Sequence, residues 1–219
     1  MPTKAELEIR INALENDVRR MNRALGQAHL DLDATVSIGF NHTVPAISEH
    51  AREAIKRAQS EWSAVVIDPC QRIDTYIRST QGLGWGWEEP YTRNGQFAWC
   101  GAAVAYFYTE LKSQIKKKIM PSCYRLYTNW AQTSRRIDHT KLQAGDIVVI
   151  YTSKRSVQGD HITLCVDAST LLDGYIKTIE GNAHGTLGDG SYDEGVITRE
   201  RTLDEIAHVY RPLSGDFNE

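Results

Sequence analysis

Residues 95–108 read GQFAWCGAAVAYFY, and this stretch places one cysteine, Cys100, directly before a run of small and apolar residues. Such a run predicts a buried helix, which we expect to continue through Leu111 and to end before Pro121, because proline cannot continue a helix. The backbone N–H groups of a helix N-terminus and a neighbouring imidazolium both stabilise a thiolate. Cys100 is therefore a candidate nucleophile, although a lone cysteine is more often a small buried hydrophobic residue.

The hydrophobic pattern changes its period on the two sides of this helix. Upstream, apolar residues at helical spacing predict a helix that Ser48 could cap and another that begins at Asp68-Pro69. Downstream, short β-branched runs between Gly, Asp and Ser turns predict the strands DIVVIY (146–151), HITLCVD (161–167), YIKTIEG (175–181), GVITRER (195–201) and AHVYRPL (207–213). Helices followed by strands indicate the α+β class, with N-terminal helices packed on an antiparallel sheet.

The N-terminal stretch carries a heptad pattern. Apolar residues separated alternately by four and three positions, as a coiled-coil seam requires, are Leu7, Ile11, Leu14, Val18, Met21 and Leu25. We expect a parallel homo-oligomer through residues 5–25, whereas the alternative is an amphipathic helix that folds back on its own domain. The domains are then a coiled-coil helix (1–28), a linker and helix (29–66) and the candidate catalytic domain (67–219).

The composition is that of an ordinary globular protein, with 41% hydrophobic residues, 24% charged residues and a net charge of −3. It predicts no nucleic-acid partner. The N-terminus MPTKAELEIRINALENDV is charged throughout, so we expect neither a secretory signal nor a membrane span. The four cysteines lack C-x-x-C spacing and the seven histidines lack paired spacing, which predicts free thiols and no metal centre.

Three further residues could complete a catalytic group with Cys100. His161 opens a predicted strand directly after turn residues, so its ring can project from the edge of a sheet. Glu180 and Asn182 stand two residues apart on the next strand and share a face if the strand pairing is regular. A carboxylate or amide that accepts from the second ring nitrogen fixes the tautomer of a histidine. Either Glu180 or Asn182 could take this orienting role.

Four stretches in order, AWCGAAVAYFY, LQAGDIVVIY, GDHITLCVDAS and IKTIEGNA, resemble the CHAP family of cell-wall hydrolases over roughly residues 67–213. CHAP stands for cysteine, histidine-dependent amidohydrolase/peptidase, and the family belongs to the papain-like NlpC superfamily. The resemblance implies a papain-like fold in which Cys100 attacks, His161 is the base, and Glu180 orients the histidine. Asn182 would orient the histidine or help to bind substrate.

The loop before Cys100 supplies the candidate substrate-binding residues. Papain-like enzymes often place an oxyanion-binding glutamine shortly before the cysteine, which implies this role for Gln96. Aromatic side chains that could line a substrate groove, or pack in the core, are Trp87, Tyr91 and Trp99. Many CHAP proteins carry an Asp-x-Asp calcium loop here, whereas this chain reads WGWEEPYTRNG. We therefore expect no calcium and no other cofactor.

The resemblance implies a cysteine hydrolase that cleaves amide bonds of peptidoglycan, as an endopeptidase or an N-acetylmuramoyl-L-alanine amidase. It also implies a phage lysin or a virion-associated wall hydrolase. Without a signal peptide, such a protein would be made in the host cytoplasm and would act on the cell wall. Two alternatives stay open: a catalytically inactive, coiled-coil-anchored structural or wall-binding module, and a papain-like peptidase or transferase that acts on a non-wall amide.

Overall fold

The computed structural model describes residues 47–63, 69–80, 98–109, 119–152, 156–186 and 192–217. The chain divides into two units, Met1–Ala46 and Ile47–Glu219, and all of the described residues belong to the second. The predicted coiled coil and three candidate substrate-binding residues, Gln96, Trp87 and Tyr91, lie outside the described residues.

Six strands of the described chain form an antiparallel sheet in the order β1-β6-β2-β3-β4-β5. From β1 to β6 their bounds are Arg136–Ile137, Ile147–Ile150, His161–Asp167, Tyr175–Thr186, Tyr192–Thr202 and Ile206–Tyr210. Strands β2 to β6 fall on the five predicted runs, and β1 is an addition. The α+β class and the antiparallel sheet are therefore confirmed.

Four α-helices lie within the described residues: α2 (Glu49–Ser63), α3 (Pro69–Arg78), α4 (Cys100–Phe107) and α6 (Cys123–Trp130). Helix α4 begins at Cys100 as predicted. It ends at Phe107, earlier than expected, because Tyr108 leaves the helical region at φ −94° and ψ 54°. Helix α6 was not predicted, although Ser122 is a cap signal whose side chain accepts the N–H of Arg125.

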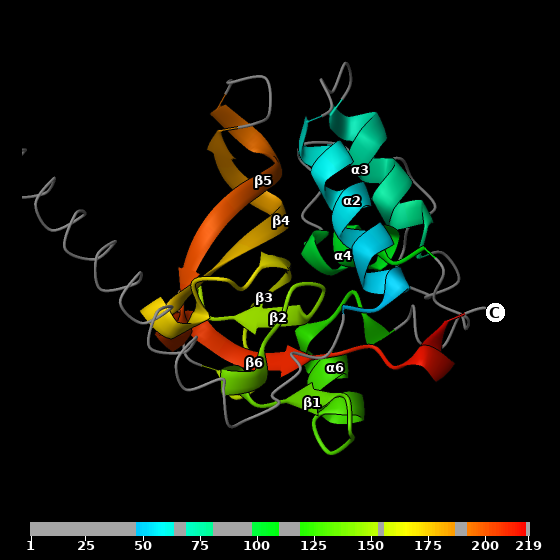
Figure 1. The fold of residues 1–219 in the computed structure, drawn as a ribbon. Helices are drawn as coiled ribbons and strands as arrows, with labels where there is room; N and C mark the ends of the chain where they lie inside the picture. Colours follow the sequence, from blue (N-terminus) through cyan, green and yellow to red (C-terminus); the bar gives the residue numbers. More distant parts are fainter. Residues whose placement is uncertain are drawn as a thin grey trace, which may run out of the picture. The chain divides into compact units, whose positions relative to one another are not determined.

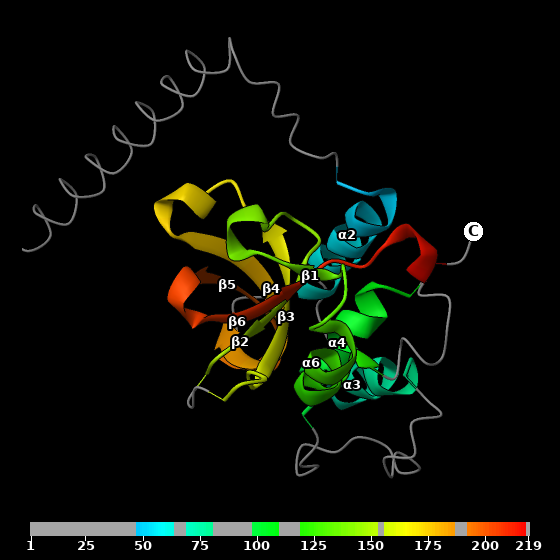
Figure 2. The same cartoon turned by 90° about the horizontal axis from the view of Figure 1, so that it is seen from below.

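The helices α2, α3 and α4 gather on one side of the sheet, as Figures 1 and 2 show. Helix α4 lies directly on β3 and β4, while α2 and α3 pack against α4. Every residue of α4 except Tyr106 is buried, as expected for a helix that is apolar on all sides. This packing holds the N-terminus of α4, and with it Cys100, against the sheet.

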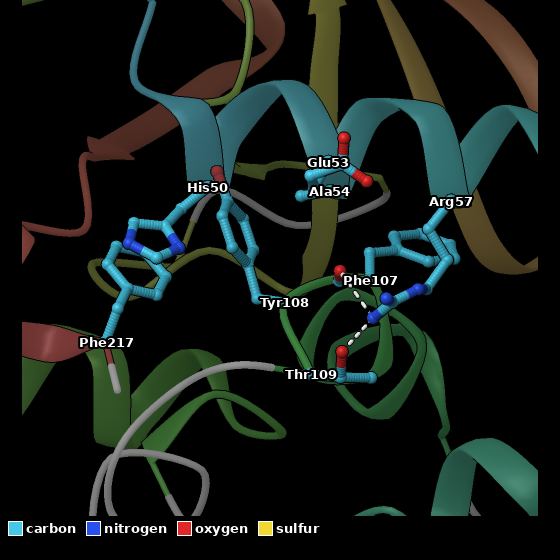
Figure 3. A pocket seen from close by; sticks show the side chains of 8 residues that line it. All are labelled: His50, Glu53, Ala54, Arg57, Phe107, Tyr108, Thr109 and Phe217. Carbon is cyan, nitrogen blue, oxygen red and sulfur yellow. Dashed lines mark hydrogen bonds between the residues drawn. The ribbon is translucent and has the colours of Figure 1, made fainter. Parts of the chain in front are cut away.

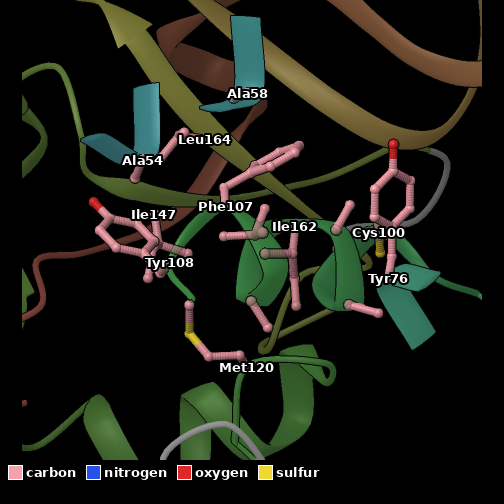
Figure 4. Close-up of a cluster of buried hydrophobic side chains, with 14 of the residues drawn as sticks. Ala54, Ala58, Tyr76, Cys100, Phe107, Tyr108, Met120, Ile147, Ile162 and Leu164 are labelled. Carbon is pink, nitrogen blue, oxygen red and sulfur yellow. The ribbon is translucent and has the colours of Figure 1, made fainter. Parts of the chain in front are cut away.

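The two faces of the sheet carry separate hydrophobic clusters because strand residues alternate between faces. In β2, Ile147 and Val149 belong to the larger cluster with the helices, whereas Val148 and Ile150 belong to the smaller one. The larger cluster is drawn in Figure 4, and Cys100 lies at its margin. The nucleophile candidate is therefore part of the packed layer between α4 and the sheet.

Candidate active site

Three of the predicted site residues, Cys100, His161 and Glu180, come together where α4, β3 and β4 meet. The Cys100 thiol and the His161 ring lie close enough together that each shifts the pKa of the other. On the other side of the ring, Nε2 lies 3.2 Å from Oε2 of Glu180. This oxygen lies off the direction of a well-aligned hydrogen bond, so the contact is a close ion pair. Because Nε2 faces Glu180, Nδ1 is the ring nitrogen left for the thiol.

The register of the strands explains why these residues meet. Cys165 of β3 pairs with Thr178 of β4, so the alternate residues His161 and Glu180 share one face of the sheet. His161 is the first residue of β3, and its ring can reach past the strand end to the start of α4. Cys100 and His161 are only 5% and 7% exposed, and Glu180 is fully buried. The group is therefore shielded from solvent.

The pKa values of the cysteine and the histidine move in opposite directions. Burial raises the pKa of the Cys100 thiol, but the contact with His161 and N–H groups of Ile162 and Gly101 outweigh it, and the pKa falls below its ordinary value. Burial likewise lowers the pKa of His161, but the interactions with the Cys100 thiol and the Glu180 carboxylate outweigh it and raise the pKa to about 9. Because the pKa of the thiol falls while that of the imidazole rises, these shifts favour a thiolate–imidazolium pair over a thiol beside a neutral imidazole.

Glu180 is held as a buried carboxylate by partners that the sequence did not indicate. Its Oε1 accepts from Arg201 Nε and from Thr178 Oγ1, both at 2.7 Å, and its Oε2 accepts from Arg201 Nη2 at 2.7 Å. Burial raises the pKa of Glu180, but the hydrogen bonds from Arg201 and the ion pair with His161 outweigh it and lower the pKa to about 2. Glu180 therefore stays ionised beside the histidine at neutral pH.

Asn182 lies in a different place from the one that regular pairing predicts. The register of β4 against β5 shifts between Glu180 and Ala183, so Gly181 and Asn182 both stand opposite Val196 in a β-bulge. Asn182 has φ 59°, in the left-handed region, and its Oδ1 accepts the N–H of Trp99 at 3.2 Å. The pairing is therefore not regular, and the expectation that Glu180 and Asn182 share one face of the sheet is wrong. Glu180 contacts the histidine, while Asn182 holds the backbone directly before the nucleophile.

Trp99 is a core residue rather than part of a substrate groove. Its side chain is fully buried, its Nε1 donates to Glu194 Oε1 at 2.9 Å, and its ring stacks on Tyr76 with centroids 5.6 Å apart. A Cβ at Gly181 would lie 2.6 Å from the Trp99 ring and 2.5 Å from Cβ of Ala103, so only glycine fits there. The bulge and the indole thus fix α4 against β4, which corrects the expectation for Trp99.

A shallow pocket lies between α2 and the end of α4 (Figure 3), and neither Cys100 nor His161 lines it. Its lining comprises His50, Glu53, Ala54, Arg57, Phe107, Tyr108, Thr109 and Phe217. Two of its side chains already have partners, since Arg57 donates to Thr109 and His50 stacks on Phe217 with centroids 4.0 Å apart. The pocket holds no nucleophile–base pair, so we do not assign it to the chemistry.

Among the residues that the structure describes, no three His, Cys, Asp or Glu side chains are grouped so as to hold a metal ion. A membrane-crossing helix, long and apolar, is likewise not found among the described residues.

Comparison with known proteins gives no relative. No family model matches the chain, and neither the curated proteins nor the solved structures provide a match. Fold and site together define an α+β protein with a buried cysteine–histidine–glutamate group.

Proposed function

We propose that the chain is a papain-like cysteine hydrolase of the CHAP type, which cleaves amide bonds in the peptides of peptidoglycan as an endopeptidase or an N-acetylmuramoyl-L-alanine amidase. The observation that carries the proposal is the contact of the Cys100 thiol with a histidine that is itself paired to Glu180. The substrate class comes from the resemblance of the stretches around these residues to cell-wall hydrolases. A role as a phage lysin or virion-associated hydrolase belongs to the same proposal.

The chemistry would proceed by acyl transfer in two steps. The Cys100 thiolate attacks the amide carbonyl carbon, and the His161 imidazolium gives its proton to the leaving amine as the C–N bond breaks. The product is a thioester between Cys100 and the acyl fragment. Water then attacks the thioester carbon while neutral His161 accepts a proton, and breaking the C–S bond restores the thiolate and releases a carboxylic acid.

The backbone at the start of α4 would stabilise the negative oxygen of the tetrahedral intermediate. Cys100 is the first residue of α4, where N–H groups have no carbonyl partner within the helix. We assign its N–H to the developing oxyanion, a role that needs a donor fixed before the reaction. Asn182 fixes the adjacent residue through the Trp99 N–H, so the bulge would help to keep this donor in place.

The test is hydrolysis of purified peptidoglycan by the full chain, followed as loss of turbidity and appearance of new amine groups. We expect turnover by the wild type and by Cys123→Ala, a control at a second free cysteine, which is partly buried. For Cys100→Ala we expect a loss of at least about a thousandfold, as is typical when a catalytic nucleophile is removed. Equal activity of wild type and Cys100→Ala would defeat the proposal.

Mass analysis of the products separates the reactions that remain. An amidase frees the peptide from the muramic acid lactyl group, whereas an endopeptidase splits the peptide itself. If the wild type binds the wall without releasing amine groups, it is an inactive binding module. If it cleaves only other amide substrates, it is a papain-like enzyme with a non-wall role.

A further inference from the structure

We propose that Arg201 is a positioning residue, which holds the Glu180 carboxylate in the one orientation that keeps Oε2 against His161. The inference rests on the proposed function, because it takes Cys100 and His161 as the reacting pair. It goes further by adding a fourth side chain, from β5, to a group drawn from α4, β3 and β4. Arg201 acts through Glu180 and does not touch the thiol.

Arg201 and Glu180 form a bidentate guanidinium–carboxylate pair, which we call the fork. Arg201 donates from Nε to Oε1 and from Nη2 to Oε2 of Glu180, each at 2.7 Å. Two parallel charge-assisted bonds fix a carboxylate in rotation as well as in position. The Oε2 atom that accepts from Arg201 is the same atom that lies 3.2 Å from Nε2 of His161. The guanidinium therefore sets the place of the oxygen that the imidazole faces.

Arg201 is itself held from its other side. Its Nη1 donates to Oε1 of Glu205 at 2.8 Å. The second oxygen of Glu205 accepts the Thr202 N–H at 2.8 Å and the Thr202 hydroxyl at 3.1 Å. The Arg201 side chain is only 12% exposed, so little solvent competes for these bonds. Both ends of the guanidinium are thus anchored, which suits it to positioning a neighbour.

The charged groups around Glu180 come from three elements. His161 faces it from β3, Arg199 and Arg201 face it from β5, and Cys100 at the start of α4 lies beyond the histidine. The two arginines differ: Arg199 Nε is 3.9 Å from Oε2 and its side chain is 41% exposed. Burial raises the pKa of Glu180, and Arg201 is the strongest influence that lowers it. Arg199 is therefore a matched control for Arg201.

Removing the bidentate contact between Arg201 and Glu180 should make the thiolate form of Cys100 less stable. Without Arg201, burial favours the protonated form of Glu180, and the carboxyl group is also free to rotate. Nε2 of His161 then loses its charged partner, so the imidazolium is less stable and the pKa of the Cys100 thiol rises. The fraction of thiolate on the acid side of its titration should fall, whereas the fraction at alkaline pH should change little.

The test is alkylation of Cys100 by iodoacetamide as a function of pH, which requires no substrate. The thiolate sulfur forms a bond to carbon as the carbon–iodine bond breaks and iodide leaves. Rates are measured on the full chain between about pH 4 and pH 10, the range in which perturbed thiols titrate. Mass analysis of the Cys100 peptide separates this reaction from that of the other cysteines, and far-UV circular dichroism reports on folding.

We expect the profile of Arg201→Gln to shift by about one pH unit toward alkaline pH, which is roughly a tenfold lower rate on the acid limb. Arg201→Lys keeps the charge without the fork and should shift in the same direction by less. Arg199→Gln should coincide with the wild type. If Arg201→Gln does not fold, Arg201→Lys decides, because it leaves the buried carboxylate paired.

The proposal is overturned if Arg201→Lys or a folded Arg201→Gln gives the wild-type profile, if either shifts toward acid pH, or if Arg199→Gln shifts as far as they do. A purely structural role would lower stability without moving the profile. The outcome is independent of the peptidoglycan assay. If the alkylation profiles shift as expected but peptidoglycan is not hydrolysed, the positioning role of Arg201 is supported and peptidoglycan is ruled out as the substrate. If peptidoglycan is hydrolysed but the profiles do not shift, the proposed substrate is supported and the role of Arg201 is overturned.

Discussion

The candidate site is a short series of side chains with alternating charge, of which the first three are buried and the last two are partly exposed. From the sulfur outward it consists of a thiolate, an imidazolium, a carboxylate, a guanidinium and a second carboxylate: Cys100, His161, Glu180, Arg201 and Glu205. A buried charge without a partner is strongly unfavourable, whereas each internal member here lies between two of opposite sign. The alternation therefore explains how a full carboxylate is retained in a fully buried position.

We expect a bell-shaped dependence of kcat/KM on pH for the proposed reaction. Below the lowered pKa of Cys100 the sulfur is protonated and cannot attack. Above the raised pKa of His161, about 9, the ring has lost the proton that the leaving amine needs. The measurement is initial rates on soluble peptidoglycan fragments at low substrate concentration.

Glu180→Gln should move the alkaline limb of that bell toward neutral pH, because an amide stabilises the imidazolium less than a carboxylate does. Both limbs belong to the coupled pair rather than to either residue alone. A rate that still rises above about pH 10 in the wild type would contradict the thiolate–imidazolium pair.

At the scale of elements, β4 and α4 are joined by close backbone packing. On one side of α4, Gly181 lies under the Trp99 ring and beside Ala103. On the other side, a Cβ at Gly101 would lie 2.4 Å from the Met120 carbonyl oxygen and 2.5 Å from Cα of Pro121. The first turn of α4 is thus confined between the sheet and the segment that leads into α6.

Gly101→Ala tests this confinement. Alanine in a helix is favoured over glycine by about 1 kcal/mol, but overpacking against backbone atoms costs about 3 kcal/mol, so the clash should prevail. We expect a loss of about 2 kcal/mol in the free energy of unfolding by urea. The alkylation rate of Cys100 should change as well, because its neighbour must shift.

The matched control is Gly215→Ala, since nothing lies within 4 Å of a Cβ at that position. Its unfolding free energy should stay within about 0.5 kcal/mol of the wild type, as for most surface substitutions. If Gly101→Ala proves as stable as Gly215→Ala, α4 is less tightly confined than the packing indicates.

At the scale of the molecule, the unit Ile47–Glu219 contains the sheet, its helices and the candidate site. The heptad seam lies in the other unit and carries a separate prediction, because the two core positions favour a parallel dimer. We expect the full chain to sediment at about twice the 24.7 kDa of one chain, and a chain that begins at Ile47 to sediment as a monomer.

Two substitutions refine that comparison. Leu14→Asp places a charge in the predicted seam and should dissociate the full chain, whereas Asn12→Asp changes a position outside the seam and should not. Equal particle masses per chain for the full and shortened proteins would instead favour a helix that folds back on its own domain.

The sequence predicts those parts of the fold that local patterns determine. The start of α4 and the strands β2 to β6 follow from apolar spacing and turn residues, and the structure contains them. Helix α6 and β1 were missed because each is short, and β1 is a strand only through its pairing with β6. The early end of α4 depends on Tyr108, whose side chain donates to the Gly145 carbonyl from a distant turn.

In the candidate site, too, local sequence patterns predict some residues, whereas others depend on the pairing of distant strands. Cys100 and His161 are each the first residue of an element, and Glu180 lies on the neighbouring strand. Their proximity could therefore be predicted from the sequence alone. Arg201 required the register of β5, and the place of Asn182 required a bulge that interrupts regular alternation. Trp99 shows the remaining difficulty, since an aromatic side chain beside a loop can be fully buried by a distant strand.

The bulge in β4 makes the distance along the chain between Glu180 and Asn182 as important as their identities. Deleting one residue there would restore a continuous ladder and turn every following side chain of β4 to the opposite face. The carboxylate could still reach the imidazole, but the amide would no longer reach the main chain in front of the sulfur. Homologous chains that use this arrangement should therefore tolerate substitutions in this segment far better than insertions or deletions.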